Sequence, residues 1–315
     1  MSPPDEVRVG LVGCGRLAER GYVPALRAAE GVRLAAVADP IRERCARAAP
    51  RVPAFANADE LIAAGGVDAL VLASPAASHL ADAQATASAG LLTLIEKPPA
   101  SSLAEAVELA GLDPAPRLSF NRRFIPAVAG LRAAVPAGDE LALTLVLTTR
   151  RSSWRSYVAS DDALLNLGPH LVDLARWLSV AEVTRVRGTV GELRARIELE
   201  LSGGRGRAFL ECAANRPYRE RLVIAAGGRQ VGAYAAGGLR AWLRLLTRGG
   251  AAEHPLVPSL TRQLEAFARA VRGEPEQTLA DALDGVAVMA TLEAARASAA
   301  RAGAWEAVGA PVPAR

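Results

Sequence analysis

Lysine occurs once in this chain, at Lys97 within the tripeptide Glu96-Lys97-Pro98. Lysine and arginine together number 37, and all of them except Lys97 are arginines. An arginine guanidinium carries charge and binds anions, but its pKa is too high for it to give up a proton. A lysine ammonium is compact and titratable. Lys97 is therefore a candidate for proton or charge chemistry. The alternative is one lysine surviving by chance in a sequence rich in arginine and alanine.

A second candidate site is the pattern Gly13-x-Gly15-x-x-Ala18, which also contains Arg16 and Leu17. Gly13 permits a tight turn, and Gly15 lets a pyrophosphate approach the backbone. The helix that follows offers free N–H groups and its positive dipole end to the phosphates. Glycines often only turn a chain. Here a strand pattern precedes the turn, a helical pattern follows it and an acidic residue closes the next strand, which favours dinucleotide binding.

Asp39 is that acidic residue, and its position about 20 residues past the glycines predicts a contact with the ribose hydroxyls. A carboxylate repels a 2′-phosphate, so Asp39 favours NAD, while Arg42 and Arg44 keep NADP possible. Asp39-Pro40 also has the form of a helix start, with Asp39 as N-cap and Pro40 as the first helical residue. The two roles are compatible.

The elements that must position these residues begin as strands alternating with helices. Apolar runs predict strands at residues 7–12, 32–38, 69–73 and 91–95. A helical stretch follows each strand, the first reaching Ala29. This alternation predicts parallel pairing with right-handed crossovers, hence an α/β domain with a doubly wound parallel sheet.

The second half of the chain has a different pattern. A helical segment from Phe124 to Val135 leads into strand patterns at 141–149, 184–190, 194–201, 207–212 and 221–225. Turns such as Ser202-Gly203-Gly204 are typical of antiparallel hairpins. Two final helices are predicted at residues 259–271 and 280–302.

Composition narrows the possible functions. The 315 residues, 51% of them hydrophobic, are enough for two domains or one large one. The net charge of +4 comes from arginines mixed with 33 acidic residues, and aromatic residues are only 4%, so nucleic-acid binding is not expected. No apolar run approaches the roughly 20 residues of a membrane span, and the first ten residues show no secretory signal. Cys14, Cys45 and Cys212 lack metal-ligand spacing, which indicates a reducing cytoplasm and no metal site.

Further motifs complete a recognisable series: Ser74-Pro75 with His79, Asn121-Arg122-Arg123-Phe124, and Gly168-Pro169-His170-x-x-Asp173. With the glycine-rich turn and Glu96-Lys97-Pro98, they occur in the order seen in one family. The chain resembles the glucose–fructose oxidoreductase / inositol dehydrogenase / rhizopine catabolism protein (Gfo/Idh/MocA) family from about Val7 to Arg301.

The resemblance implies an N-terminal Rossmann domain at residues 1–118 that binds NAD(P). It implies a C-terminal α+β domain at residues 119–315 with a large, open, mostly antiparallel sheet, the last helices packing back on the first domain. In such proteins the outer face of the sheet often joins subunits, so a homodimer or homotetramer is expected.

Family chemistry implies reversible hydride transfer between a nicotinamide and a secondary alcohol or ketone of a sugar or cyclitol, at a site between the domains. Lys97 resembles the family lysine that contacts both substrate and cofactor, and the bond before Pro98 is often cis in relatives. His170 matches the family histidine that serves as acid/base or positions the hydroxyl. The alternative is a structural cap partner near the start of a helix. The resemblance adds Ser74, His79, Glu96 and Asn121 to the cofactor site, although His79 could simply cap its own helix.

Asn166 departs from the family pattern, which places an aspartate four residues before the histidine. Residues 166, 170 and 173 share one helix face. Asparagine can hold a substrate hydroxyl but cannot stabilise an imidazolium by charge, and it is also a good N-cap. The glycine run expected before the helix is replaced by residues 160–163. Three consequences fit the replacement of the aspartate by Asn166: a changed substrate, a proton relay that relies more on Lys97, or reduced dehydrogenase activity.

Six residues are predicted to contact the substrate: Lys97, Arg122, Trp154, Arg155, Asn166 and His170. With Arg150, Arg151 and Tyr157, the Trp154-Arg155 segment could bind an anionic group; the alternative is a solvated arginine cluster. Tyr157 is also a possible alternative acid.

Two other functions stay open from the sequence. Some relatives use bound NAD transiently to cleave or epimerise glycosides, without net redox change. A non-catalytic ligand sensor or partner subunit derived from the family is the other. Asn166 keeps the latter possible, and the intact Glu96-Lys97-Pro98 argues against it.

Overall fold

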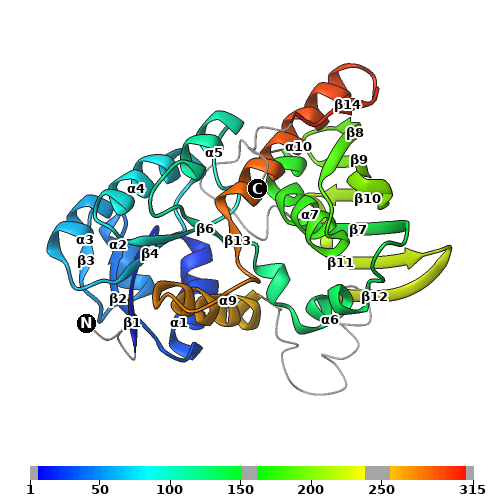
Figure 1. Ribbon diagram of the computed structural model, residues 1–315. Helices are drawn as coiled ribbons and strands as arrows, with labels where there is room; N and C mark the ends of the chain where they lie inside the picture. Colours follow the sequence, from blue (N-terminus) through cyan, green and yellow to red (C-terminus); the bar gives the residue numbers. More distant parts are fainter. Residues whose placement is uncertain (1–5, 151–161, 238–255, 310–315) are drawn as a thin grey trace. The chain divides into compact units, whose positions relative to one another are not determined.

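The computed structural model describes residues 6–150, 162–237 and 256–309 (Figure 1). The chain forms two compact units, one of residues 1–125 with 254–286, the other of residues 126–253 with 287–315. The domain boundary expected from sequence, at residues 118 and 119, lies just before the end of the first of these segments and stays a prediction. Within the described residues, no helix combines the length and the apolar character that crossing a bilayer requires.

The first unit is built on a seven-stranded sheet of order β13-β6-β5-β4-β1-β2-β3. Its strands are β1 (Val7–Val12), β2 (Val32–Ala38), β3 (Ala54–Phe55), β4 (Ala69–Leu72), β5 (Leu92–Ile95), β6 (Arg117–Leu118) and β13 (Ala280–Asp281). All pairs are parallel except β13 with β6. Every residue of β4 is buried, as expected for a central parallel strand covered on both faces. The predicted doubly wound sheet is confirmed.

Helices cover both faces of this sheet (Figure 1). The series α3 (Ala58–Ala64), α4 (Ala76–Ser88) and α5 (Leu103–Ala110) packs neighbour on neighbour. On the other side α1 (Val23–Ala28) packs against α9 (Leu256–Val271). The remaining helical segments are η1 (Ala18–Tyr22), which is a π-helical turn, α2 (Arg42–Ala48) and η2 (Asn121–Phe124).

The second unit is built on another seven-stranded sheet, of order β12-β11-β7-β10-β9-β8-β14. Its strands are β7 (Leu141–Arg150), β8 (Val183–Val190), β9 (Arg194–Leu201), β10 (Gly206–Ala213), β11 (Asn215–Ala226), β12 (Arg229–Gly237) and β14 (Glu306–Ala307). Only β7 and β10 pair in parallel, so the expected mostly antiparallel sheet is confirmed. The helical segments are α6 (Pro126–Ala134), α7 (Ala163–Ser179), η4 (Ser202–Gly204) and α10 (Ala282–Ala300), the last of which starts in the first unit.

The strand β12 was not predicted from the sequence. It is rich in alanine and glycine, residues that are depleted in strands, so its composition carried no strand pattern. It forms at the edge of the sheet because its backbone pairs with β11.

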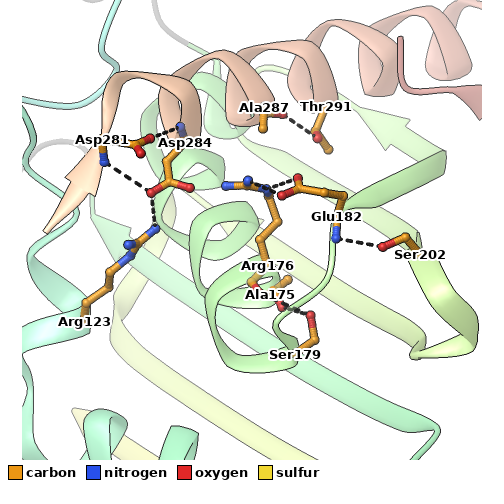
Figure 2. Close-up of polar contacts among 10 residues, drawn as sticks. All are labelled: Arg123, Ala175, Arg176, Ser179, Glu182, Ser202, Asp281, Asp284, Ala287 and Thr291. Carbon is orange, nitrogen blue, oxygen red and sulfur yellow. Dashed lines mark hydrogen bonds and ion pairs between the residues drawn. The ribbon is translucent and has the colours of Figure 1, made fainter. Parts of the chain in front are cut away.

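The end of α7 is held by a set of polar contacts (Figure 2). Arg176 donates through Nε and Nη2 to the two carboxylate oxygens of Glu182, each at 2.8 Å. The Ser179 hydroxyl donates to the Ala175 carbonyl oxygen at 2.7 Å. Between these residues Val180 ends the helix in the left-handed conformation, with φ of 54° and 71% of its surface exposed. A β-branched residue is strained there.

We therefore expect Val180→Gly to raise the free energy of unfolding by about 1 kcal/mol, because glycine takes this conformation without strain and little apolar burial is lost. Urea denaturation of the two proteins measures the difference. Val107 is a matched control, since it is also exposed (42%) but lies inside α5. Val107→Gly should destabilise by a few tenths of a kcal/mol, up to about 1. A loss of stability in Val180→Gly would contradict the prediction.

Candidate functional site

Predicted site residues of the first unit follow the carboxyl ends of successive parallel strands. Gly13 follows β1, Asp39 follows β2, Ser74 follows β4, Glu96 follows β5 and Asn121 follows β6. The strand order reverses between β1 and β4, which are neighbours in the sheet. Open α/β sheets bind ligands outside the carboxyl ends of their strands at such a reversal. The fold therefore gathers these residues at the edge where a ligand is expected.

The glycine-rich turn has the shape that a pyrophosphate requires. Gly13 has φ of +91°, and a Cβ on it would stand 2.6 Å from the Ser74 backbone nitrogen. Gly15 differs, since a Cβ on it would meet no atom within 4 Å. Gly13 thus packs the turn against the loop after β4, and Gly15 leaves open space over the backbone. The residues present fit a dinucleotide phosphate. Arg16 and Leu17, which follow Gly15, are partly buried, and Leu17 packs against the hydrophobic core.

Asp39 is buried and holds the turn. Its Oδ2 accepts a hydrogen bond from the Cys14 backbone N–H at 2.9 Å, and its Oδ1 accepts one from the Ile41 N–H at 2.9 Å. Arg44 Nη1 lies 3.6 Å from Oδ1. The carboxylate thus stays beside the turn, where a ribose contact requires it. The predicted N-cap role is wrong: α2 begins at Arg42 with Ile41 as N-cap, because Asp39 binds the N–H two residues on rather than a helical one.

His79 is fully inside the protein and links two loops of the site. Its Nε2 lies 2.9 Å from the Ser74 carbonyl oxygen and its Nδ1 lies 3.2 Å from the Pro99 carbonyl oxygen. Burial lowers the pKa of the imidazole, which favours the neutral ring. His79 does not cap its own helix, since α4 begins after Pro75 with no side-chain cap. It instead joins the loop after β4 to the segment after Lys97.

Glu96 and Lys97 lie at the end of β5. The buried Glu96 carboxylate accepts the Lys97 backbone N–H on Oε2 at 2.9 Å. Lys97 is partly buried, and the Lys97–Pro98 bond is cis, as expected. The Tyr22 hydroxyl donates to Glu96 Oε1 at 2.7 Å, and the Ser119 hydroxyl lies 2.8 Å from the same oxygen. The sequence analysis missed Tyr22 and Ser119, because nothing distinguishes them from ordinary core residues until the fold brings them to Glu96.

The residues that follow β6 have different roles. Asn121 Nδ2 donates to the Ser259 hydroxyl of α9 at 3.0 Å, and Arg122 Nη1 lies 3.5 Å from Asn121 Oδ1. Arg123 is 4% exposed and donates to Asp284 Oδ2 at 3.0 Å (Figure 2). Arg123 therefore has a structural role, joining η2 to the start of α10. Arg122, which is partly buried, stays a predicted substrate ligand.

In the second unit, α7 carries Asn166, His170 and Asp173. The N-cap of this helix is Asp162, whose Oδ1 accepts the Leu165 N–H at 2.7 Å. The alternative of Asn166 as N-cap is therefore wrong, because the helix begins one turn earlier. His170 and Asp173 are buried and Asn166 is partly buried.

Gly168, in the same motif, has a packing function. A Cβ on it would lie 3.1 Å from the Leu292 side chain of α10 and 2.9 Å from that of Leu164. Glycine here lets α7 and α10 approach closely.

Trp154 and Arg155, predicted to bind substrate, lie outside the described residues, as do Arg151 and Tyr157. Arg150 is the last residue of β7. No cluster of three or more His, Cys, Asp or Glu side chains suited to a metal ion occurs among residues 6–150, 162–237 and 256–309.

Known proteins resemble the chain in sequence and in fold. Residues 7–113 match the Gfo/Idh/MocA family, described as an oxidoreductase family with an NAD-binding Rossmann fold. The rhizopine catabolism protein MocA of Rhizobium meliloti is 34% identical over 195 residues, which cover 57% of this chain and 59% of that protein. Inositol 2-dehydrogenase of Acidothermus cellulolyticus is 32% identical over 209 residues, which cover 62% and 60%. The chain thus matches about three fifths of the length of these relatives.

A solved structure extends the likeness of fold to nearly the whole chain. The scyllo-inositol dehydrogenase of Lactobacillus casei, with bound NAD(H) and scyllo-inositol, superposes with a TM-score of 0.80 at 17% identity, over 96% of this chain and 99% of that one. Both sheets are therefore those of this fold. With its glycine-rich turn, the segment 7–113 is an NAD-binding Rossmann domain of the Gfo/Idh/MocA oxidoreductase family, and the rest of the chain shares the fold of these dehydrogenases.

Proposed function

We propose that the chain is an NAD-dependent oxidoreductase that transfers a hydride between the nicotinamide and a secondary alcohol or ketone of a cyclitol or sugar. The observation that carries the proposal is the location of Lys97: the only lysine of the chain follows β5, at the sheet edge that also carries the glycine-rich turn. An inositol is the first substrate to test, because the relatives matched in sequence include inositol 2-dehydrogenases.

The reaction converts CH–OH to C=O and releases one proton. NAD, when bound, supplies the acceptor for the hydride. As the hydroxyl proton leaves, negative charge develops on the substrate oxygen, and a lysine ammonium stabilises it. We assign that role to Lys97 and the acid/base role to His170, with Asn166 holding a substrate hydroxyl.

The first experiment is a titration of the purified protein with NADH and with NADPH, followed by nicotinamide fluorescence. Reduction of NAD with cyclitols and sugars is then followed at 340 nm. Tight NADH binding with turnover of a polyol supports the proposal. Absence of nicotinamide binding would refute it.

Asp39 is expected to decide between the two cofactors. Asp39→Asn keeps an acceptor for the Cys14 N–H but removes the charge, so NADH affinity should fall about tenfold and NADPH affinity should rise. Asp68→Asn is the matched control. The Asp68 carboxylate is paired with Arg8, and Asp68 directly precedes β4, so it lies at the amino ends of the parallel strands, away from the glycine-rich turn. Equal effects of the two substitutions on the NADH/NADPH ratio would count against the role of Asp39.

Two further expectations belong to this proposal. Homodimer or homotetramer formation follows from the resemblance, and light scattering on the purified protein measures it. Cytoplasmic residence fits the free, buried thiols of Cys14, Cys45 and Cys212.

A further inference from the structure

A buried network of polar side chains surrounds the Glu96 carboxylate in the first unit. Tyr22 comes from η1, Ser119 from the end of β6 and Gln263 from α9. All three are at most 1% exposed, and Glu96 is 6% exposed. Two of these groups, Tyr22 and Ser119, contact the Glu96 carboxylate directly, and Gln263 contacts Ser119. Groups from three elements far apart in sequence thus form one buried network that satisfies a buried carboxylate.

Each oxygen of Glu96 has a different task. Oε2 accepts the Lys97 backbone N–H at 2.9 Å, so the side chain folds back on the peptide that carries Lys97. Oε1 accepts the Tyr22 hydroxyl at 2.7 Å. The Ser119 hydroxyl lies 2.8 Å from Oε1, 2.8 Å from the Tyr22 oxygen and 3.0 Å from Gln263 Oε1. Burial, and next the charge of Glu96, hold the pKa of Tyr22 well above its usual value, so the phenol remains a donor.

We infer that Tyr22 and Ser119 are positioning residues for Lys97, which they orient through Glu96. A carboxylate held on Oε1 by two hydroxyls cannot rotate, so Oε2 stays under the Lys97 N–H and the Glu96–Lys97 peptide has one orientation. That peptide sets the direction of the Lys97 Cα–Cβ bond, from which the side chain extends. The expected effect on kcat rests on the proposed function. The orientation of Lys97 does not, and it can be tested without turnover.

Tyr22 also connects Lys97 to the nucleotide turn. It ends the π-helical turn Ala18–Tyr22, which starts at the last residue of the glycine-rich pattern. The extra residue of a π-helical turn changes the direction of the side chains that follow, and such turns are frequent at functional sites. The element expected to receive the pyrophosphate therefore also holds, through Tyr22 and Glu96, the residue that acts on the substrate.

The test uses the fact that the chain has a single lysine. Protein labelled with [ε-13C]lysine gives one lysine ε-carbon resonance, which reports on the surroundings of Lys97 alone. In Tyr22→Phe the ring remains and only the hydroxyl is lost. We expect the resonance to shift or to split, NADH affinity to stay within about threefold, and kcat with a polyol to fall at least about tenfold with KM little changed.

Thr86→Val is the matched control. Thr86 is also fully buried, and its hydroxyl donates to the Asp82 carbonyl oxygen at 2.6 Å. It lies in α4, the helix before β5, and β5 leads to Lys97 at its other end. This variant loses a buried hydroxyl at similar cost to folding and should leave the Lys97 resonance and turnover unchanged.

The outcomes separate the two proposals. A Lys97 resonance in Tyr22→Phe that superimposes on the wild-type signal would overturn the positioning role. If Tyr22→Phe does not fold, Ser119→Ala answers the same question through the second hydroxyl on Oε1. If the wild-type protein turns over no polyol, the proposed function fails, and the resonance still decides whether Tyr22 orients Lys97.

Discussion

Replacing Lys97 with alanine is expected to lower kcat for polyol oxidation by about a thousandfold, because the substrate oxygen loses the cation that stabilises its developing charge. NADH affinity should fall much less, since phosphate and ribose contacts are assigned to the glycine-rich turn and Asp39. Kinetics with the best substrate of the polyol screen, together with an NADH titration, measure both quantities.

Lys97→Arg is the informative companion to this substitution. Arginine keeps the positive charge but is larger and does not titrate in proteins, so we expect most of the loss to remain. Full activity of Lys97→Arg would show that only charge matters at this position. Retained activity of Lys97→Ala would remove Lys97 from the mechanism.

Gly15→Ala is expected to weaken NADH binding by about a hundredfold, equivalent to about 2.7 kcal/mol, without changing the free energy of unfolding. The added Cβ would meet no protein atom within 4 Å, so the protein should fold normally. The methyl group would occupy the open space that the pyrophosphate requires.

Gly13→Ala should behave differently. Its Cβ would lie 2.6 Å from the Ser74 nitrogen and 2.8 Å from the Ala73 carbonyl oxygen, at a positive φ that alanine avoids. We expect losses of both stability and NADH affinity. Gly130→Ala in α6, where a Cβ would meet nothing within 4 Å, serves as control and should stabilise the helix. Urea denaturation and NADH titration of the three variants separate packing from ligand contact. Unchanged NADH affinity in Gly15→Ala would contradict the phosphate role of the turn.

Much of the fold could be predicted because its signals are local. The apolar-rich runs at residues 7–12 and 32–38, in which Arg8 and Arg33 are the only charged residues, predicted the bounds of β1 (Val7–Val12) and β2 (Val32–Ala38). The glycine-rich turn and Asp39 were recognisable because their spacing reflects backbone conformation and strand length. The alanine- and glycine-rich β12 was not predictable, since its strand state depends on pairing with β11.

Helix starts show the limit of local signals. Both Asp39 and Asn166 had good N-cap residue types, yet the caps of α2 and α7 are Ile41 and Asp162. Several nearby polar residues can cap a helix equally well in isolation. The choice depends on contacts made elsewhere, such as the bond from the Cys14 N–H to Asp39.

The sequence by itself indicated the family resemblance, the Rossmann turn and a role for Lys97, because these depend on residue type and on spacing along the chain. Only the tertiary structure decided what holds Lys97 in place. Tyr22, Ser119 and Gln263 are separated from Glu96 by up to 167 residues, yet they form one buried network. No local pattern marks a buried tyrosine or serine as the partner of a particular carboxylate. Their roles arise when the packing of η1, β6 and α9 around β5 buries these groups side by side, so that they hydrogen-bond to one another and to the neighbouring backbone.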